Sequence, residues 1–110
     1  MNSQEMETAV RLGLNLVVLV LNDGAFGMIR WKQYSLGYPD FGLRFGNPDF
    51  VLYAQSYGAG GHRVQSAGEL VPLLEQCVTA GGLHLVEVPV DYSENNKVFL
   101  DELKAKVCLV

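Results

Sequence analysis

The run from Leu14 to Leu21 constrains the fold most, because every residue in it except Asn15 is apolar and no polar residues alternate with them. A strand with one face in water alternates in polarity, whereas a strand covered on both faces of a parallel sheet is apolar throughout. The run is also far shorter than the roughly 20 residues that cross a bilayer. We therefore predict a buried parallel strand that ends abruptly at Asn22-Asp23-Gly24.

Other segments have the patterns of further strands and helices. Strands are expected at His62–Val64 and Leu83–Val90, and Pro89 should mark the point where the ladder of the second one fails. Helices are expected at Gln4–Leu12, from Asn47 to about Tyr57, from Ser66 to about Thr79, and in a polar tail from about Glu94.

Two of the predicted helices have recognisable starts. Asn47 can cap a helix, Pro48 fits the first turn, and Asp49 suits the positive end of the helix dipole. Ser66 and Glu69 form a capping-box pattern, Ser-x-x-Glu. The segment 25–34 is ambiguous, because its alternation fits a strand while a strand-turn-helix arrangement fits equally, and residues 35–47 are expected to form a loop.

The predicted order of elements is α-β-α-α-β-α-β, which favours an α/β fold with a mainly parallel sheet, because parallel strands need long crossover connections. Helices should cover both faces, as in half of a doubly wound domain. Three strands leave the apolar strand at Leu16–Leu21 short of neighbours, and an exposed apolar edge promotes aggregation. We therefore expect residues 1–110 to be an incomplete doubly wound domain, truncated at its front.

Composition excludes several classes of function. The net charge is −4 and the basic residues are scattered, so no nucleic-acid partner is expected. The N-terminus lacks the pattern of a secretory signal, which makes the cytoplasm the default compartment, with no membrane partner. Cys77 and Cys108 have no His or Cys nearby at metal spacing, and neither do His62 and His84. Reduced thiols and packed or surface histidines are therefore expected.

The segment from Leu21 to Met28 is the best candidate for a functional site. It follows a buried strand, and ligands of open α/β sheets bind outside the carboxyl ends of strands. Asp23 offers a hard oxygen for Mg²⁺, while Gly24 and Gly27 let backbone groups approach an anionic ligand. The alternative is a β-hairpin, because Asp-Gly between apolar runs is a strong hairpin signal. The local pattern favours the site over the hairpin only slightly.

Several motifs together resemble the C-terminal pyrophosphate-binding domain of thiamine-diphosphate enzymes of the acetolactate synthase large-subunit family, and the resemblance spans nearly the whole chain. The motifs are Met1-Asn2-Ser3-Gln4-Glu5-Met6-Glu7-Thr8-Ala9, Asn22-Asp23-Gly24-Ala25-Phe26-Gly27-Met28-Ile29-Arg30, Asn47-Pro48-Asp49-Phe50, Tyr57-Gly58-Ala59 and Pro89-Val90-Asp91-Tyr92-Ser93-Glu94-Asn95.

The resemblance implies roles for individual residues. In this family the metal motif opens with Gly-Asp-Gly and closes with Asn-Asn, and Asn22-Asp23 occupies the closing pair with Asp in place of the second Asn. It implies Asp23 and the main-chain carbonyl of Ala25 as Mg²⁺ ligands. Gly27 and Met28 would lie beside the diphosphate, and Asn22 and Gly24 would contribute to the same cofactor site.

The resemblance also implies a parent enzyme that decarboxylates pyruvate and joins it to a second 2-keto acid, within a homo-oligomer that contains the remaining domains of the subunit. It also allows for FAD bound in that parent enzyme in a structural role. The opening Asp would fall just before Met1 and is absent, as is the domain whose glutamate activates the cofactor, so this chain alone should be inactive. The alternatives are a non-catalytic truncated product or interaction module, or a fragment of a related 2-keto acid decarboxylase or oxidase.

Overall fold

A computed structural model describes residues 3–92 and 94 of the chain. The elements are α1 (Glu5–Arg11), β1 (Leu16–Asn22), α2 (Gly27–Ser35), α3 (Phe50–Ser56), β2 (Gly60–Arg63), α4 (Ala67–Ala80) and β3 (Leu83–Pro89). They divide between two compact units. We call Met1–Asn22 with Asn47–Pro89 the sheet unit, and Asp23–Gly46 with Val90–Val110 the loop-helix unit.

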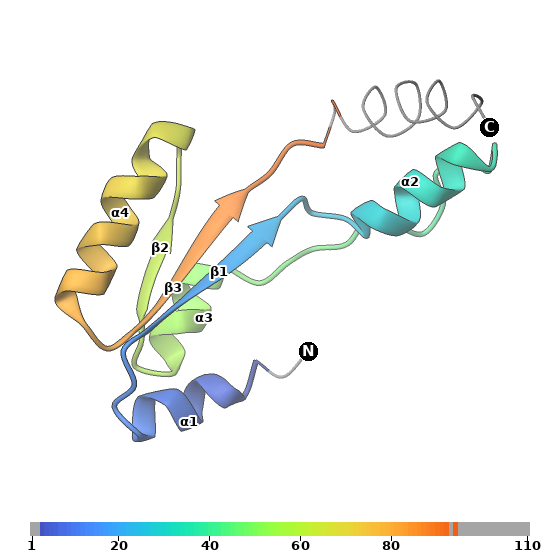
Figure 1. Ribbon diagram of the computed structural model, residues 1–110. Coiled ribbons are helices and arrows are strands. Elements are labelled where there is room, and N and C mark those ends of the chain that lie inside the picture. Colours follow the sequence, from blue (N-terminus) through green and yellow to red (C-terminus); the bar gives the residue numbers. More distant parts are fainter. Residues whose placement is uncertain (1–2, 93, 95–110) are drawn as a thin grey trace, which may run out of the picture. The chain divides into compact units, whose positions relative to one another are not determined.

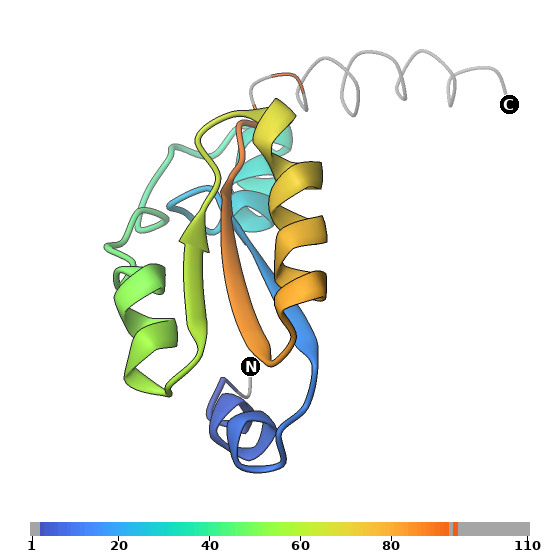
Figure 2. The same cartoon turned by 90° about the vertical axis from the view of Figure 1, so that its left-hand side faces the viewer.

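The sheet unit contains three parallel strands in the order β1-β3-β2 (Figure 1). Helices cover both faces of this sheet, and α3 and α4 lie on opposite sides of it (Figure 2). On one face Met6 and Ala9 of α1 and Ala54 of α3 pack against Leu83 and Leu85 of β3. The fold class predicted from the order of elements is confirmed.

The opposite face of the sheet has a second core, which is built on α4. Cys77 of this helix packs with Val64 and Val86, and Val86 has no exposed surface. Leu70, Leu73 and Leu74 of α4 extend the same cluster. Successive side chains of β3 point to opposite faces and enter different cores, so the middle strand is buried on both faces.

Strand β1 pairs with β3 alone among the described strands, so it forms an edge of the sheet. The prediction that it is parallel is confirmed, but the predicted full burial is wrong: Val18 and Val20 pack against one core and Val17 against the other, yet no residue of β1 is buried. Its side chains alternate only between partly buried and exposed, and Leu21 is 63% exposed. The apolar run therefore leaves large aliphatic side chains in solvent at an unpaired edge, which is the arrangement that promotes association.

The loop-helix unit contains α2, which resolves the ambiguity of residues 25–34 in favour of the strand-turn-helix arrangement. The hairpin alternative for Asp23-Gly24 is wrong, since β1 is followed by a short turn and then by this helix. In this unit an isolated antiparallel bridge joins Ala25 to Arg44, where Phe26 N–H donates to the carbonyl of Leu43 at 3.0 Å.

Two predicted helix starts need correction. The cap of α3 is Asp49, whose carboxylate accepts from the amides of Val51 and Leu52 at 2.9 and 3.1 Å. Asn47 is not the cap, because its side-chain amide donates a hydrogen bond to the side-chain oxygen of Asn22. Helix α4 does follow Ser66, but the Ser66 side chain makes no capping bond, and Glu69 accepts from the amide of Gln65 instead.

No helix in the described part of the chain is long and apolar enough to span a membrane. The polar helix expected from about Glu94 falls almost entirely on residues 95–110, which lie outside the described residues, as does Cys108.

Substitutions at two glycines, one packed tightly against α3 and one open to solvent in α4, should have opposite effects on stability. A Cβ at Gly61 would overlap the backbone carbonyl oxygen of Val51 and lie 2.9 Å from its Cα, so Gly61→Ala should lower the free energy of unfolding by about 1–3 kcal/mol. Gly68 lies in the first turn of α4 with no atom near its Cβ direction, so Gly68→Ala should raise this free energy by up to about 1 kcal/mol. Urea denaturation followed by circular dichroism measures both, and equal effects would contradict the packing described.

Candidate functional site

The carboxyl ends of the three parallel strands meet at one edge of the sheet, and polar side chains gather there. Asn22 ends β1, Arg63 ends β2, and Glu87 lies two residues before the end of β3. Parallel pairing in register places Arg63 opposite Glu87, and Asn22 opposite Pro89. This is the edge at which open α/β sheets bind their ligands.

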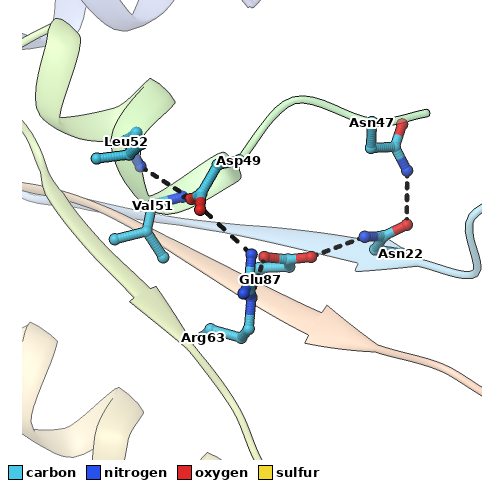
Figure 3. A network of polar contacts seen from close by, with 7 residues as sticks. All are labelled: Asn22, Asn47, Asp49, Val51, Leu52, Arg63 and Glu87. Carbon is cyan, nitrogen blue, oxygen red and sulfur yellow. Dashed lines mark hydrogen bonds and ion pairs between the residues drawn. The ribbon is translucent and has the colours of Figure 1, made fainter.

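The carboxylate of Glu87 joins all three strands (Figure 3). Its Oε1 accepts from the side-chain amide of Asn22 at 2.7 Å, and its Oε2 accepts from Nε of Arg63 at 2.7 Å. Glu87 is 4% exposed and is the one buried charged residue of the described chain. A carboxylate buried to this degree needs such partners, because removing it from water is costly unless it is paired and hydrogen-bonded.

The network extends from Glu87 to the loop that precedes α3. The Asn22 side-chain oxygen accepts from the amide of Asn47 at 2.7 Å, and Arg63 also lies 3.8 Å from the capping carboxylate of Asp49. The hydrogen bond from Arg63 to Glu87 raises the pKa of the guanidinium, the charge of Glu87 adds to this effect, and burial opposes it. Arg63 therefore stays charged and holds both carboxylates.

Sequence reasoning missed Glu87, Arg63 and Asn47 as members of this site. The available signal was Glu87 itself, a charged residue within the apolar segment Leu83–Val90. A charge inside a buried strand implies a partner, but its identity depends on which strands pair, which local sequence does not show.

The residues predicted from the sequence as metal and cofactor ligands follow β1. Asp23 Oδ1 accepts from the amide of Ala25 at 3.1 Å, which forms a tight turn. Gly24 has φ of 65°, a left-handed conformation that favours glycine. Gly27 begins α2, and a Cβ there would overlap Asp23 Oδ2 and lie 3.4 Å from a ring carbon of Tyr92. The carboxylate of Asp23 therefore lies against the first residue of the helix.

The structure brings together five of the six predicted site residues, Asp23, Gly24, Ala25, Gly27 and Met28, in the loop-helix unit. Met28 is 76% exposed in the first turn of α2. Asn22 belongs to the sheet unit, and its side chain is bonded to Glu87 and Asn47. Ligand binding by all six residues stays a prediction.

His62, Cys77 and His84 are distant in sequence, but they lie close together in the structure. The side chains of His62 and His84 are hydrogen-bonded at 3.1 Å, and together with Cys77 they place three potential ligand atoms within 4.8 Å of one another. The expectation that these residues have no partner is therefore wrong. The two histidines are 22 residues apart in sequence, and the strands that carry them are neighbours in the sheet.

The polar network predicts that Arg63 contributes strongly to stability. Arg63→Met removes a partner of the buried Glu87 carboxylate, so the free energy of unfolding should fall by about 2–4 kcal/mol. Arg11→Met is the matched control, because Arg11 pairs with Glu7 on an exposed helix surface and should change stability by less than about 0.5 kcal/mol. Urea denaturation of both variants measures the two changes in the free energy of unfolding. Equal losses would show that Glu87 does not depend on Arg63.

Comparison with known proteins places the chain in a family. Residues 1–88 match the model of the thiamine pyrophosphate enzyme, C-terminal TPP binding domain. Acetolactate synthase of Bacillus subtilis (strain 168) is 40% identical over 93% of this chain, and the catabolic acetolactate synthase of Raoultella terrigena is 36% identical over 86% of it. The chain spans only 18% and 17% of the lengths of these two relatives.

A solved structure has the same fold. The thiamine diphosphate-dependent 4-hydroxybenzoylformate decarboxylase of Rhodococcus jostii RHA1 superposes with a TM-score of 0.73 at 27% sequence identity, over 81% of this chain and 17% of the decarboxylase chain. The family match covers most of the chain, and β1, the turn after it, α2, β2 and all of β3 except Pro89 lie within it. The chain therefore belongs to the family of C-terminal thiamine pyrophosphate-binding domains of thiamine pyrophosphate enzymes.

Proposed function

We propose that this chain forms the Mg²⁺- and diphosphate-binding part of an acetolactate synthase-like enzyme. The observation that carries the proposal is the Asp23 carboxylate, which lies against Gly27 at the start of α2. Carboxylate and carbonyl oxygens are the ligands that Mg²⁺ prefers, and it is usually bound by one or two carboxylates together with phosphate oxygens. Asp23 and the carbonyl of Ala25 would be the protein ligands.

The start of α2 suits the diphosphate. The ladder of this helix begins with the bond from Arg30 N–H to the carbonyl of Phe26, so the amides of Gly27 and Met28 precede it. Amides at a helix N-terminus point away from the helix and favour anions. Gly27 also keeps the backbone accessible, since any side chain there would displace the Asp23 carboxylate. The residues present therefore fit both the metal and the phosphate.

The sheet unit would support this segment by fixing where β1 ends. Asn22 is held by Glu87 and Asn47, so the residue before Asp23 is anchored to the middle strand and to the loop before α3. Asn22 would then assist cofactor binding through its backbone and by orienting Asp23, because both of its side-chain groups already have partners. Bound thiamine diphosphate would supply the electron sink for decarboxylation of a 2-keto acid.

The reaction we propose for the parent enzyme is decarboxylation of pyruvate and its ligation to a second 2-keto acid. The similarity to two acetolactate synthases supports it. The remaining domains of the subunit and a second subunit would complete the site, and this chain alone would be inactive. FAD in the parent is a further expectation that rests on the resemblance alone, and a cytoplasmic location is one that rests on the N-terminal sequence pattern.

An interaction module is the second candidate function. The exposed edge of β1, where Leu21 is 63% exposed, favours it, because an apolar edge strand can pair with another chain. In this case the chain would associate with intact subunits without contributing to turnover.

Calorimetric titration of the 110-residue chain with thiamine diphosphate tests the cofactor proposal. Binding should require Mg²⁺ and should be lost with a chelator. Asp23→Ala should weaken binding by at least about tenfold, whereas Asp23→Asn should retain most of it, because the amide still presents an oxygen to the metal. Asp40→Ala is the matched control, since Asp40 is an acid of the same unit that pairs with Arg30 and Arg44. Equal affinities of the Asp23→Ala and Asp40→Ala variants would contradict the metal assignment.

A substitution at Gly27 tests the same site without removing a ligand. Gly27→Ala should displace the Asp23 carboxylate and weaken Mg²⁺-dependent binding of thiamine diphosphate by about tenfold. Gly46→Ala, at a glycine of the same unit with no neighbouring atom, should leave affinity unchanged. Normal binding by the Gly27→Ala variant would show that the cofactor does not use the start of α2.

A further inference from the structure

We propose that His62, His84 and Cys77 form a Zn²⁺ site between α4 and the sheet. Their ligand atoms, two imidazole nitrogens and one thiol sulfur, all lie within 4.8 Å of one another. Imidazole and thiolate are the ligands that zinc prefers, whereas Mg²⁺ takes oxygen. The site would be independent of the cofactor segment after β1.

The fold places the three side chains on one face of the sheet. In the parallel pairing of β2 with β3, Gly60 lies opposite His84 and His62 lies opposite Val86. His84 and His62 therefore share the face of Val86, which packs with Cys77 of α4. The site is remote from the carboxyl edge, because Val17 is the partner of His84 and Asn22 lies five residues further along β1, about 16 Å away.

The distances match a tetrahedral ion with little adjustment. Zinc bonds of about 2.05 Å to nitrogen and 2.3 Å to sulfur separate two nitrogens by about 3.3 Å, and a nitrogen and a sulfur by about 3.6 Å. Nε2 of His62 and Nδ1 of His84 are 3.1 Å apart, close to the first of these values. The upper bound of 4.8 Å for the set requires Cys77 Sγ to approach each nitrogen by no more than about 1.2 Å.

The proton on His84 lies on the nitrogen away from the other two residues. Its Nε2 is 3.0 Å from the carbonyl oxygen of Gly81, and a carbonyl can only accept, so Nε2 carries the hydrogen. With the hydrogen on Nε2, the lone pair of Nδ1 points toward His62. A histidine that ligates zinc usually donates its other N–H to such a carbonyl, which fixes ring orientation and tautomer. The outer contact of a zinc ligand is thus already formed.

Burial affects the ionisable groups of this cluster. Burial lowers the pKa of His62, and the nearby His84 lowers it further. Burial also raises the pKa of the Cys77 thiol, which is 2% exposed. Zinc binding would therefore release the thiol proton, as metal ions do when they bind cysteine.

The backbone at Gly60 leaves room for the two imidazoles. Gly60 has no side chain, and a Cβ there would overlap His84 Nδ1 and lie 3.2 Å from His62 Nε2. A pocket of about 220 Å³ lies beside Cys77, and its lining also includes Val17, Val78 and Gly81. Three protein ligands leave the fourth position of a tetrahedral ion to water.

Co²⁺ titration of the 110-residue chain, followed by absorbance, tests this site. We expect one equivalent to give a thiolate-to-cobalt charge-transfer band and the visible bands of tetrahedral cobalt, and Zn²⁺ to displace both. His62→Gln, His84→Gln and Cys77→Ser should each weaken Co²⁺ binding by at least about tenfold, and Cys77→Ser should abolish the charge-transfer band.

Two matched controls separate this site from other binding. Cys108→Ser removes the other thiol of the sequence and should leave the spectrum unchanged, whereas chelation by an unfolded chain would depend on both cysteines equally. Asp23→Ala should also leave it unchanged, so failure of the cofactor proposal would not affect this test. The absence of a tetrahedral cobalt spectrum from the wild-type chain, or affinities that the three ligand variants do not alter, would overturn the proposal.

Discussion

The ion pair between Glu87 and Arg63 is the interaction on which the rest of the sheet unit depends. Glu87 is buried on the middle strand and bonded to both neighbouring strands, so its carboxylate fixes the carboxyl ends of β1 and β2 relative to β3. Because a buried carboxylate without partners would be costly, any slip in strand register would carry a large penalty. The end of β1, where the chain leaves the sheet toward Asp23, is defined by this constraint.

Local sequence predicted the order of elements because each boundary has a local cause, such as the glycine after α1 or the Asp-Gly turn after β1. It failed where a long-range partner decided the outcome. Asn47 suits a helix cap, but its amide bonds to Asn22, and Asp49 caps α3 instead. The segment 25–34 fitted both a strand and a helix for another reason. Helix α2 has no buried residue in the described chain, so its sequence shows no clear apolar face.

The two candidate sites offer different kinds of ligand atom. The segment after β1 could be found from sequence, because its residues are consecutive and carry the family motif. The cluster of His62, His84 and Cys77 could not, since two strands and a helix must pack before its atoms meet. Hard oxygen donors occur in the first and nitrogen and sulfur donors in the second, so Mg²⁺ and Zn²⁺ should sort between them without competition.

Paramagnetic broadening in amide NMR spectra shows whether Asp23 and its neighbours hold the metal and diphosphate. Mn²⁺ substitutes for Mg²⁺ because both are hard ions that prefer oxygen ligands. With thiamine diphosphate present, trace Mn²⁺ should broaden the amides of Asp23, Ala25 and Gly27 and leave those of Gly60 and His84 sharp. Broadening that spares Asp23 to Gly27 would contradict the account.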